Sequence, residues 1–589
     1  MFRSRPLVPS WGRARASARA SARASARAFD RAFDRAFVRA FVRPSRRAVR
    51  EHWLVAVILL CGTAVRVAVQ FAYQQALIFP DSERYLQYAQ NFLNGDWSPD
   101  WLRTSGYSLL LMPAVLAHNL TVVVAIQHLM GLAMGVLVYA TLIHFGARRW
   151  LAAVCTIPVL FDPLELDIEQ YILTDISATF LVVVALVVLV WRREALSNKA
   201  AWAAGVLIAA ATIIRENDLL VMIPALLYLL VIIRPRRRLL ARAGRLLAGC
   251  LIPVLGYLAW FFVWFHTFNF VTYSNQFMYG RIAQFADCTG LSLPPYEEYL
   301  CPQQPPAERN PDFYMWAPLS PQVTLTPTAG LSKGQIIHAF NWAILKHQPL
   351  TYVEVVANDI LYSFSPVRGD GPEKYPTAYH DFHTYFPSGK GEEATLRAFS
   401  HASPRVQPEL AGFLTDYGHD FWVPGPVLAG GLVLGLAGMA GIGRARARSS
   451  SARARPAPSR LRAPCMLFTL GAIFLVVPPF IIATFDWRYE LPQFPLIPIA
   501  AVLGVMAMAE RRGHAGDPAA VSLPAEETET PAGGSAASPA GGPSPAPAGK
   551  PAASPAGGSA ASPAGEPSPA PAGEPDAAPA EWEAPSTRP

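Results

Sequence analysis

Residues 53–72, WLVAVILLCGTAVRVAVQFA, form the first long apolar run of the chain and set its class. A helix that crosses a bilayer needs about 20 such residues, so this run predicts a transmembrane helix. The acidic triplet Asp81-Ser82-Glu83 follows it closely, and Arg103-Thr104-Ser105-Gly106-Tyr107 comes next. A carboxylate beside hydrocarbon is costly unless a water-filled cavity or a partner receives it, so these acids indicate function.

The composition agrees with a membrane protein. Of the 589 residues, 52% are apolar and 16% are charged, whereas soluble domains carry about 25% charged residues. The net charge of +8 comes from short Lys and Arg clusters between apolar segments. Clusters of this kind are typical of membrane topology rather than of a nucleic-acid-binding face, so we expect no nucleic-acid partner.

The apolar runs predict an all-α polytopic membrane protein with about ten transmembrane helices. Gly106–His118 is shorter, and we expect a helix at the membrane surface there. The ten predicted spans are Trp53–Ala72, Leu120–Phe145, Trp150–Phe161, Ile176–Trp191, Ala201–Ile214, Leu219–Ile233, Leu246–Phe265, Phe421–Ile442, Met466–Thr484 and Leu491–Ala509.

The positions of Lys and Arg predict how the chain crosses the cell membrane. Alternate connections are basic, as in Arg234–Arg238, and basic connections favour the cytoplasmic side. Both termini are then cytoplasmic. The acidic connections 73–118 and 162–175 and the long insert 266–420 fall together on the external face, where we expect the active site.

The same pattern divides the chain into five parts. Residues 1–50 are a basic low-complexity cytoplasmic segment, and 51–265 form an N-terminal transmembrane catalytic module. Residues 266–420 form an external α-rich insert, and 421–510 hold the C-terminal transmembrane helices. Residues 511–589 are rich in Pro, Ala, Gly and Ser, a composition that predicts a disordered cytoplasmic tail.

Two cysteines differ from the other four in their surroundings. Cys288 and Cys301 lie in the insert, where an external, oxidising compartment allows a disulfide. Two free thiols are the alternative. The remaining cysteines lie in or beside apolar spans and are expected to be small core residues.

The acidic triplet allows more than one interpretation. Asp81 could cap a helix opened by Pro80. Asp81 and Glu83 could instead supply oxygen ligands to a divalent metal such as Mg or Mn. His118 and His128 lack a second ligand at metal-binding spacing, and we expect them to be core or interface residues.

Several motifs together resemble the GT-C glycosyltransferases, especially the protein-mannosyltransferase and aminoarabinose-transferase branch. Besides the acidic triplet and the Arg103–Tyr107 turn, they are Glu169–Asp175 (EQYILTD), Ile214–Asn217 (IREN) and Trp487–Pro492 (WRYELP). The resemblance extends over about residues 53–509. Two departures stand out: the double proline of the family's Arg-Gly-Tyr turn is missing, and the insert matches no family signature.

The resemblance implies a sugar donor linked to polyprenyl phosphate and an inverting transfer to a glycan, lipid or protein acceptor of the cell envelope. Asp81 would be the general base, assisted by Glu83 or Asp175. Guanidinium groups bind phosphate strongly, which favours Arg215 and Arg488 and then Arg103 as phosphate ligands. The matched motifs add three further candidates for donor binding: Arg84, Tyr107 and Tyr489.

Three other interpretations remain open. A transporter or flippase of lipid-linked sugars would also line a cavity with arginines and carboxylates, although such proteins often contain internal repeats, which this sequence lacks. Any single arginine could simply extend to the membrane interface. A non-catalytic membrane scaffold would leave the clustering of charged motifs on one face unexplained.

Overall fold

The computed structural model describes residues 46–192, 196–328, 330–371, 380–387, 390–441 and 460–513. Within these residues all regular structure is helical, and extended pairing is limited to three isolated bridges. The predicted all-α class is therefore confirmed. The predicted disordered tail and almost all of the basic N-terminal segment lie outside the described residues.

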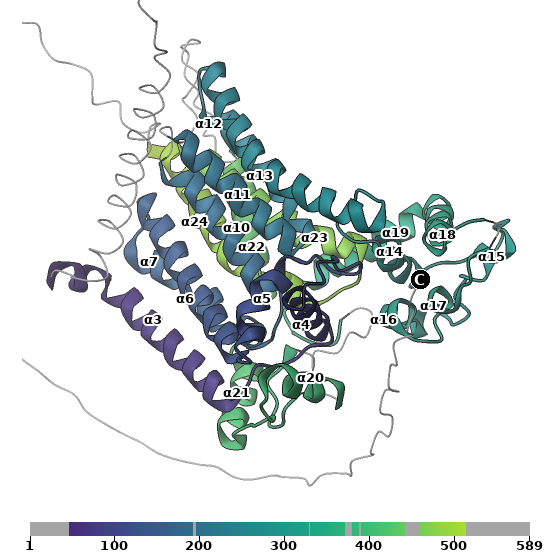
Figure 1. Ribbon diagram of the computed structural model, residues 1–589. Helices are drawn as coiled ribbons and strands as arrows, with labels where there is room; N and C mark the ends of the chain where they lie inside the picture. Colours follow the sequence, from purple (N-terminus) through teal and green to yellow (C-terminus); the bar gives the residue numbers. More distant parts are fainter. Residues whose placement is uncertain are drawn as a thin grey trace, which may run out of the picture. The chain divides into compact units, whose positions relative to one another are not determined.

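Two groups of helices make up the membrane part, and they share one apolar core (Figure 1). In the first group each helix packs on the next, and in the second all three pack together. The first consists of α3 (Arg46–Ala72), α6 (Thr121–His144), α10 (Asp175–Trp191), α11 (Asn198–Ile214) and α13 (Arg236–Phe265). The second consists of α22 (Gly425–Ala440), α23 (Arg462–Ile482) and α24 (Gln493–Gly513). Contacts of α24 with α6 and of α10 with α23 join the groups.

The count of about ten spans is not confirmed. Among the described residues, five helices are long and apolar enough to cross a membrane, in α3, α6, α13, α23 and the segment Trp487–Ala509. The pair α21 (Pro408–Asp420) and α22, bent by 52°, could be a sixth. The predicted span Trp150–Phe161 is instead two short helices, α7 (Arg149–Val154) and α8 (Ile157–Phe161).

The remaining apolar helices are too short to count by length alone. Both α10 and α11 have 17 residues, which at about 1.5 Å per residue is less than the roughly 30 Å of a hydrocarbon core. The predicted span Leu219–Ile233 forms a 3₁₀ turn, η3 (Glu216–Val221), and the 11-residue α12 (Met222–Ile232). The predicted surface segment forms α5 (Gly106–Leu116), which packs on α4 (Pro80–Leu93) and α11.

A buried ionic cluster joins α3 and α6 of the first group to a short neighbouring helix. Arg66 of α3 contacts Glu169 of α9 (Pro163–Gln170) at 2.7 Å, and Glu169 contacts His128 of α6, also at 2.7 Å. Arg66 and Glu169 are almost fully buried. Gly131 of α6 makes room for them, because a Cβ atom there would overlap Glu169 Oε1. His128 is thus a buried partner of a carboxylate within the bundle.

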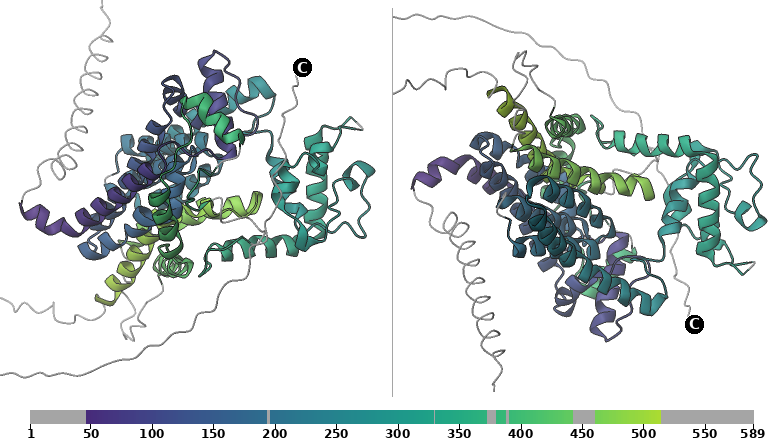
Figure 2. Two further views of the ribbon diagram at one scale, coloured as in Figure 1. Left: turned by 90° about the horizontal axis from the view of Figure 1, so that it is seen from below. Right: turned by 90° about the horizontal axis from the view of Figure 1, so that it is seen from above.

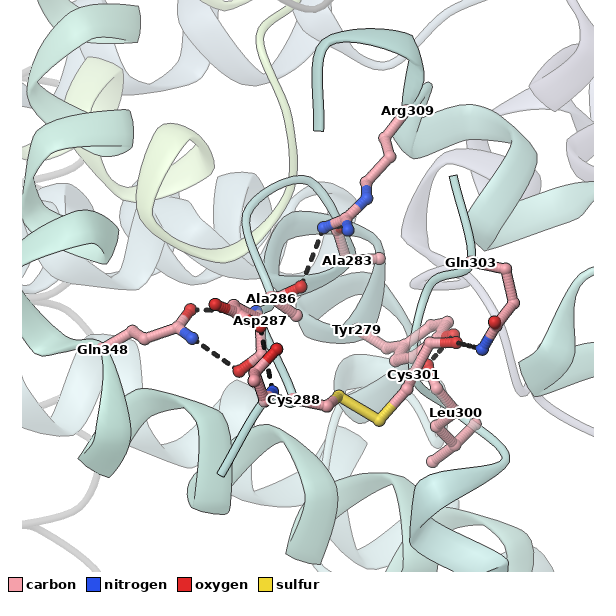
Figure 3. Close-up of a disulfide and its surroundings, with 11 residues drawn as sticks. Tyr279, Ala283, Ala286, Asp287, Cys288, Leu300, Cys301, Gln303, Arg309 and Gln348 are labelled. Atoms are coloured by element: carbon pink, nitrogen blue, oxygen red, sulfur yellow. Dashed lines mark hydrogen bonds between the residues drawn. A yellow bond between two sulfur atoms is a disulfide. The ribbon is translucent and has the colours of Figure 1, made fainter. Parts of the chain in front are cut away.

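Residues 274–347 form a small lobe with its own apolar core. Its main helices are α14 (Ser274–Ala283), α16 (Pro311–Trp316) and α18 (Lys333–His347), with the single turns α15 (Pro295–Glu298) and α17 (Pro321–Thr324) between them. Cys288 and Cys301 are joined in a disulfide (Figure 3). Arg309 donates to the carbonyl oxygens of Ala283 and Ala286 nearby, which fixes the loop to the end of α14.

The second half of the predicted insert belongs to the helical bundle rather than to the lobe. After α19 (Pro349–Tyr362), helix α20 (Lys390–Ser400) packs on α4, and α21 packs on α3. Phe382, Leu396 and Leu414 are buried in the core of the bundle. The segment 266–420 is largely helical, as expected, but it divides into a lobe and a cover over the bundle.

Gly131→Ala should destabilise the protein. The added methyl group overlaps Glu169, and either overpacking, at about 1–3 kcal/mol, or disruption of the ion pair, at about 3–5 kcal/mol, follows. We expect the thermal unfolding midpoint in detergent to fall by roughly 1–5 °C, the shift that follows for a chain of this size. Gly62→Ala is the matched control, because its Cβ meets Leu160 at 3.5 Å, an ordinary contact. Equal midpoints for the two variants would contradict the packing described here.

Candidate functional site

Helix α4 presents Asp81 to a pocket instead of using it as a cap. The helix begins at Pro80, and Phe79 is its N-cap residue. The backbone N–H of Phe79 donates to Ser82 Oγ at 2.9 Å, and the Ser82 hydroxyl donates to the carbonyl of Ile172. The interpretation of Asp81 as the N-cap is therefore wrong. Ser82, at the third position of the helix, accepts from the backbone of the N-cap residue, and the Asp81 carboxylate turns toward two arginines.

A cavity of about 180 Å³ brings together chain segments that are far apart in the sequence. Its charged lining residues come from the start of α4, the turn before α5, the start of α10, the end of α11 and the turn before α24. The predicted site residues that line it are Asp81, Arg103, Asp175, Arg215, Arg488 and Tyr489. The other lining residues include Tyr85, Thr104, Glu216, Asn217, Ser274, Phe277, Pro479 and Ile482.

One wall of the pocket is an alternating chain of charges. Asp81 Oδ1 accepts from Arg103 Nη2 at 2.7 Å, and Asp81 Oδ2 lies 3.4 Å from Arg488 Nη1. Arg488 Nε lies 2.6 Å from Asp486 Oδ2. Asp486 Oδ1 contacts His380 Nε2 at 2.9 Å. Arg488 is thus held between two carboxylates, and Arg103 is held by one. These contacts fix the positions of both arginines.

A second ion pair lines the same cavity. Asp175 Oδ1 lies 2.6 Å from Arg215 Nη1, and Asp175 is 1% exposed. Asp175 Oδ2 is buried and has no hydrogen-bond partner among the residues that the structure describes. The guanidinium of Arg215 lies over the ring of Tyr489, 5.3 Å from its centroid, and that of Arg488 lies 5.7 Å from the same centroid. Two guanidinium groups that line one cavity thus lie near the same tyrosine ring.

The lobe supplies aromatic rings to the same pocket. The guanidinium of Arg103 lies 5.1 Å from the ring centroid of Phe277 in α14 and 5.8 Å from that of Trp316 in α16. Such cation–π contacts stabilise a guanidinium without neutralising it. Arg103 is thereby oriented by Asp81 on one side and by the lobe on the other.

The arginines decide the ionisation of the carboxyl groups around them. Burial alone would raise the pKa of Asp81, but the charges of Arg103 and Arg488 outweigh it and lower that pKa below its usual range. Asp486 behaves in the same way beside Arg488 and His380, so its pKa is also lowered. For Asp218, next to the pocket, burial outweighs the opposing charge of Arg215 and raises the pKa of Asp218 to about 7.

Three predicted site residues do not line the pocket. Glu83 is exposed. Arg84 contacts Asp100 at 2.6 Å and lies over the ring of Trp101. Tyr107 is buried and donates to Gln127 at 2.8 Å. Arg84 and Tyr107 therefore support the loop and helix α5 around the site instead of facing its cavity.

Sequence reasoning missed two residues that hold the site together. Asp486 lies two positions before Arg488, and its proximity to a predicted phosphate ligand was an available signal. His380 lies in a stretch without periodicity or motif. Only the fold brings His380 beside Asp486, so no pattern in the sequence could identify it.

The carboxylates of the triplet do not fit a shared metal ion. Residues two apart on a helix point in directions roughly 200° apart, so Asp81 and Glu83 cannot bind one cation together. Asp81 already contacts two guanidinium groups. Over the described parts of the chain, no group of three or more His, Cys, Asp or Glu residues could hold a metal ion. The roles proposed for this site rest on the protein's own residues.

One family of known proteins matches part of the chain. Residues 115–269 match the family model of dolichyl-phosphate-mannose-protein mannosyltransferase. This family is part of the GT-C superfamily, so the resemblance stated from the motifs is confirmed. The match includes Asp175 and Arg215, whereas Asp81, Arg103 and Arg488 lie outside it. Searches of curated proteins and of solved structures found no match.

The raised pKa of Asp218 gives a test by pH. The folded protein keeps a proton on Asp218 up to about pH 7, whereas an unfolded Asp loses it near pH 4. The stability of the folded state therefore falls as pH rises from about 4 to 7 and is constant above that range. The substitution Asp218→Asn removes the fall in stability that deprotonation of Asp218 causes. We expect the variant to unfold at a higher temperature than the wild type at pH 8, with a smaller difference at pH 5.

The control for this test is Asp420→Asn, which changes an exposed carboxylate in the same way. It should shift the unfolding midpoint equally little at both pH values. If Asp218→Asn raised the unfolding temperature by the same amount at pH 5 and pH 8, the raised pKa of Asp218 would be refuted.

Proposed function

We propose that the protein is an integral membrane glycosyltransferase that takes a sugar from a polyprenyl-phosphate donor and transfers it to an envelope glycan, lipid or protein on the external face of the cell membrane. The observation that carries the proposal is one pocket with three arginines and two aspartates from five separate segments. The family match supports a membrane mannosyltransferase that uses a polyprenyl-phosphate sugar, and we therefore take mannose as the first sugar to test.

The phosphate of the donor would bind among Arg215, Arg488 and Arg103. Guanidinium groups stay charged at any physiological pH and form paired hydrogen bonds to phosphate oxygens. Arg215 and Arg488 both line the cavity, and both guanidinium groups lie near the ring of Tyr489. A phosphate between them would contact both groups, while the prenyl chain remained in the membrane.

Asp81 would act as general base in a single displacement. Its carboxylate takes the proton from the acceptor hydroxyl, and the hydroxyl oxygen attacks the anomeric carbon. The bond from that carbon to the phosphate oxygen breaks, and the phosphate leaves with the electron pair. The configuration at the anomeric carbon is inverted. The arginines stabilise the negative charge that develops on the leaving phosphate.

Donor binding would also prepare the base. In the structure both Asp81 oxygens are engaged by guanidinium groups, which makes the carboxylate a weak base. A bound phosphate competes for the same two groups, and each contact it gains weakens one to Asp81. The Asp81 carboxylate thereby becomes more basic when the donor is present. Asp175, whose Oδ2 has no hydrogen-bond partner in the described part of the chain, is the assisting carboxylate.

Asp81→Asn should abolish transfer, because an amide cannot accept the proton. The expected loss is about 10²–10⁴-fold, the usual contribution of a general base. Transfer of radiolabelled sugar from polyprenyl-phosphate mannose to an endogenous acceptor, in membranes with matched expression, measures it. Glu83→Gln removes a carboxylate two residues away that is exposed, and it should keep wild-type activity. Loss of activity in both variants would show that Asp81 has no special role.

The same assay separates the enzyme from its alternative. A wild-type protein that transfers no sugar, but moves lipid-linked sugar across the bilayer of proteoliposomes, would be a flippase. In that case Asp81→Asn would change transport, and the proposed transferase would be refuted.

Arg488→Lys and Arg215→Lys should each weaken donor binding. Lysine keeps the charge but loses the paired hydrogen bonds to phosphate. We expect KM for the donor to rise roughly tenfold to a hundredfold, as for the loss of one charged hydrogen bond. Arg405→Lys, at an exposed position, is the control. A KM unchanged in both pocket variants would exclude these arginines as phosphate ligands.

A further inference from the structure

Helix α19 carries an apolar stripe that no part of the described chain covers. Leu350, Val353 and Leu361 are 82%, 61% and 71% exposed. At roughly 100° per residue these positions and Ala357 lie on one side of the helix, within about a quarter of its circumference. Three large apolar side chains in line are more than scattered surface exposure, and a contiguous apolar surface of this kind indicates an interaction.

The other two sides of α19 have different environments. On one side Val356 and Asp359 are buried, and Asp359 forms a 2.5 Å ion pair with Arg281 of α14. Between that side and the stripe run Thr351, Glu354 and Asn358, all exposed. The helix therefore has a face toward protein, a polar face and an apolar face.

Both ends of α19 are attached to membrane helices. The Tyr352 hydroxyl donates to the carbonyl oxygen of Ile481, at the end of α23, at 2.8 Å. Just after α19, the backbone of Phe364 and Ser365 closely approaches Gly425, the first residue of α22. Figure 2 shows α19 between the lobe and these helices. The helix is therefore held at the level where α22 begins and α23 ends.

The nearest apolar phase at that level is the bilayer. Ile481 and Ile482 of α23 are each 39% exposed, and Val427 of α22 is 63% exposed, so the two membrane helices that hold α19 also expose apolar side chains near it. In the preceding helix α18, Lys346 lies 5.2 Å from the ring centroid of Trp342. Trp and Lys side chains are favoured at the headgroup level of a membrane.

We propose that α19 is an interfacial anchor whose apolar stripe, Leu350, Val353, Ala357 and Leu361, lies among the lipid acyl chains of one leaflet. Its polar face turns toward the headgroups and water, as in helices that lie in a membrane interface. The ion pair of Arg281 and Asp359 couples the anchor to α14, which supplies Ser274 and Phe277 to the pocket. The anchor thus holds one wall of the pocket at the membrane surface.

Collision accessibility of spin labels tests this anchor without any assay of activity. The full-length protein, with Cys61→Ala and Cys155→Ala to limit background labelling, receives Val353→Cys or, as the matched neighbour, Glu354→Cys. Each labelled protein is placed in nanodiscs of phosphatidylcholine and phosphatidylglycerol. Oxygen concentrates in hydrocarbon, and a water-soluble nickel chelate stays outside it. We expect the ratio of oxygen to nickel accessibility to be several-fold higher at 353 than at 354.

Two results would overturn the anchor. High nickel accessibility at both positions would mean that the stripe faces water. Low accessibility of 353 to both reagents would mean that protein covers it, for example a second copy of the chain. Because the readout is independent of sugar transfer, it stands whether or not the protein proves to be a glycosyltransferase.

Discussion

The pocket depends on the mutual neutralisation of charges that could not be buried singly. Asp81, Arg488 and Asp486 alternate in sign, with Arg103 at one end of the chain and His380 at the other. A buried charge without its partner costs several kcal/mol, so each member requires the others in place. The partners come from segments up to about four hundred residues apart in the sequence. Formation of the pocket therefore requires that both groups of membrane helices have already packed.

The packing of the helical bundle fixes the segments that carry these charges. The ionic cluster of Arg66, Glu169 and His128 lies deep between α3, α6 and α9, with a glycine at the closest approach. Helix α9 is buried along its whole length and leads through Tyr171 to Asp175 at the start of α10. The acid that pairs with Arg215 is thus fixed by the packing of the helix before it. Loops that hold reactive groups are usually mobile, but here short turns between buried helices hold them.

The sequence predicted the helical class and most of the charged residues of the pocket. Asp81, Arg103, Asp175, Arg215, Arg488 and Tyr489 were found because they follow or precede apolar runs on the same predicted face. Glu83 does not line the pocket, because the helix that directs Asp81 toward the pocket directs the side chain two positions later toward solvent. The number of spans could not be predicted, since a run such as Trp150–Phe161 reads as apolar whether it crosses a bilayer or breaks into two short helices inside the protein.

The charge balance of the pocket bears on what it can bind. Its lining residues include Asp81, Asp175 and Glu216 against Arg103, Arg215 and Arg488, so the formal charges cancel before any ligand arrives. A phosphodiester adds a negative charge, and the site can accept it only by sharing guanidinium groups that now contact carboxylates. Asp218 eases this step, because burial raises the pKa of Asp218 to about 7 and the group can be neutral near Arg215. A pocket with unpaired arginines would hold phosphate more tightly but would release it slowly after transfer. Arginines that are paired with carboxylates gain less free energy when they bind the donor. They return to these carboxylates when the phosphate leaves, which favours repeated turnover over retention of the phosphate.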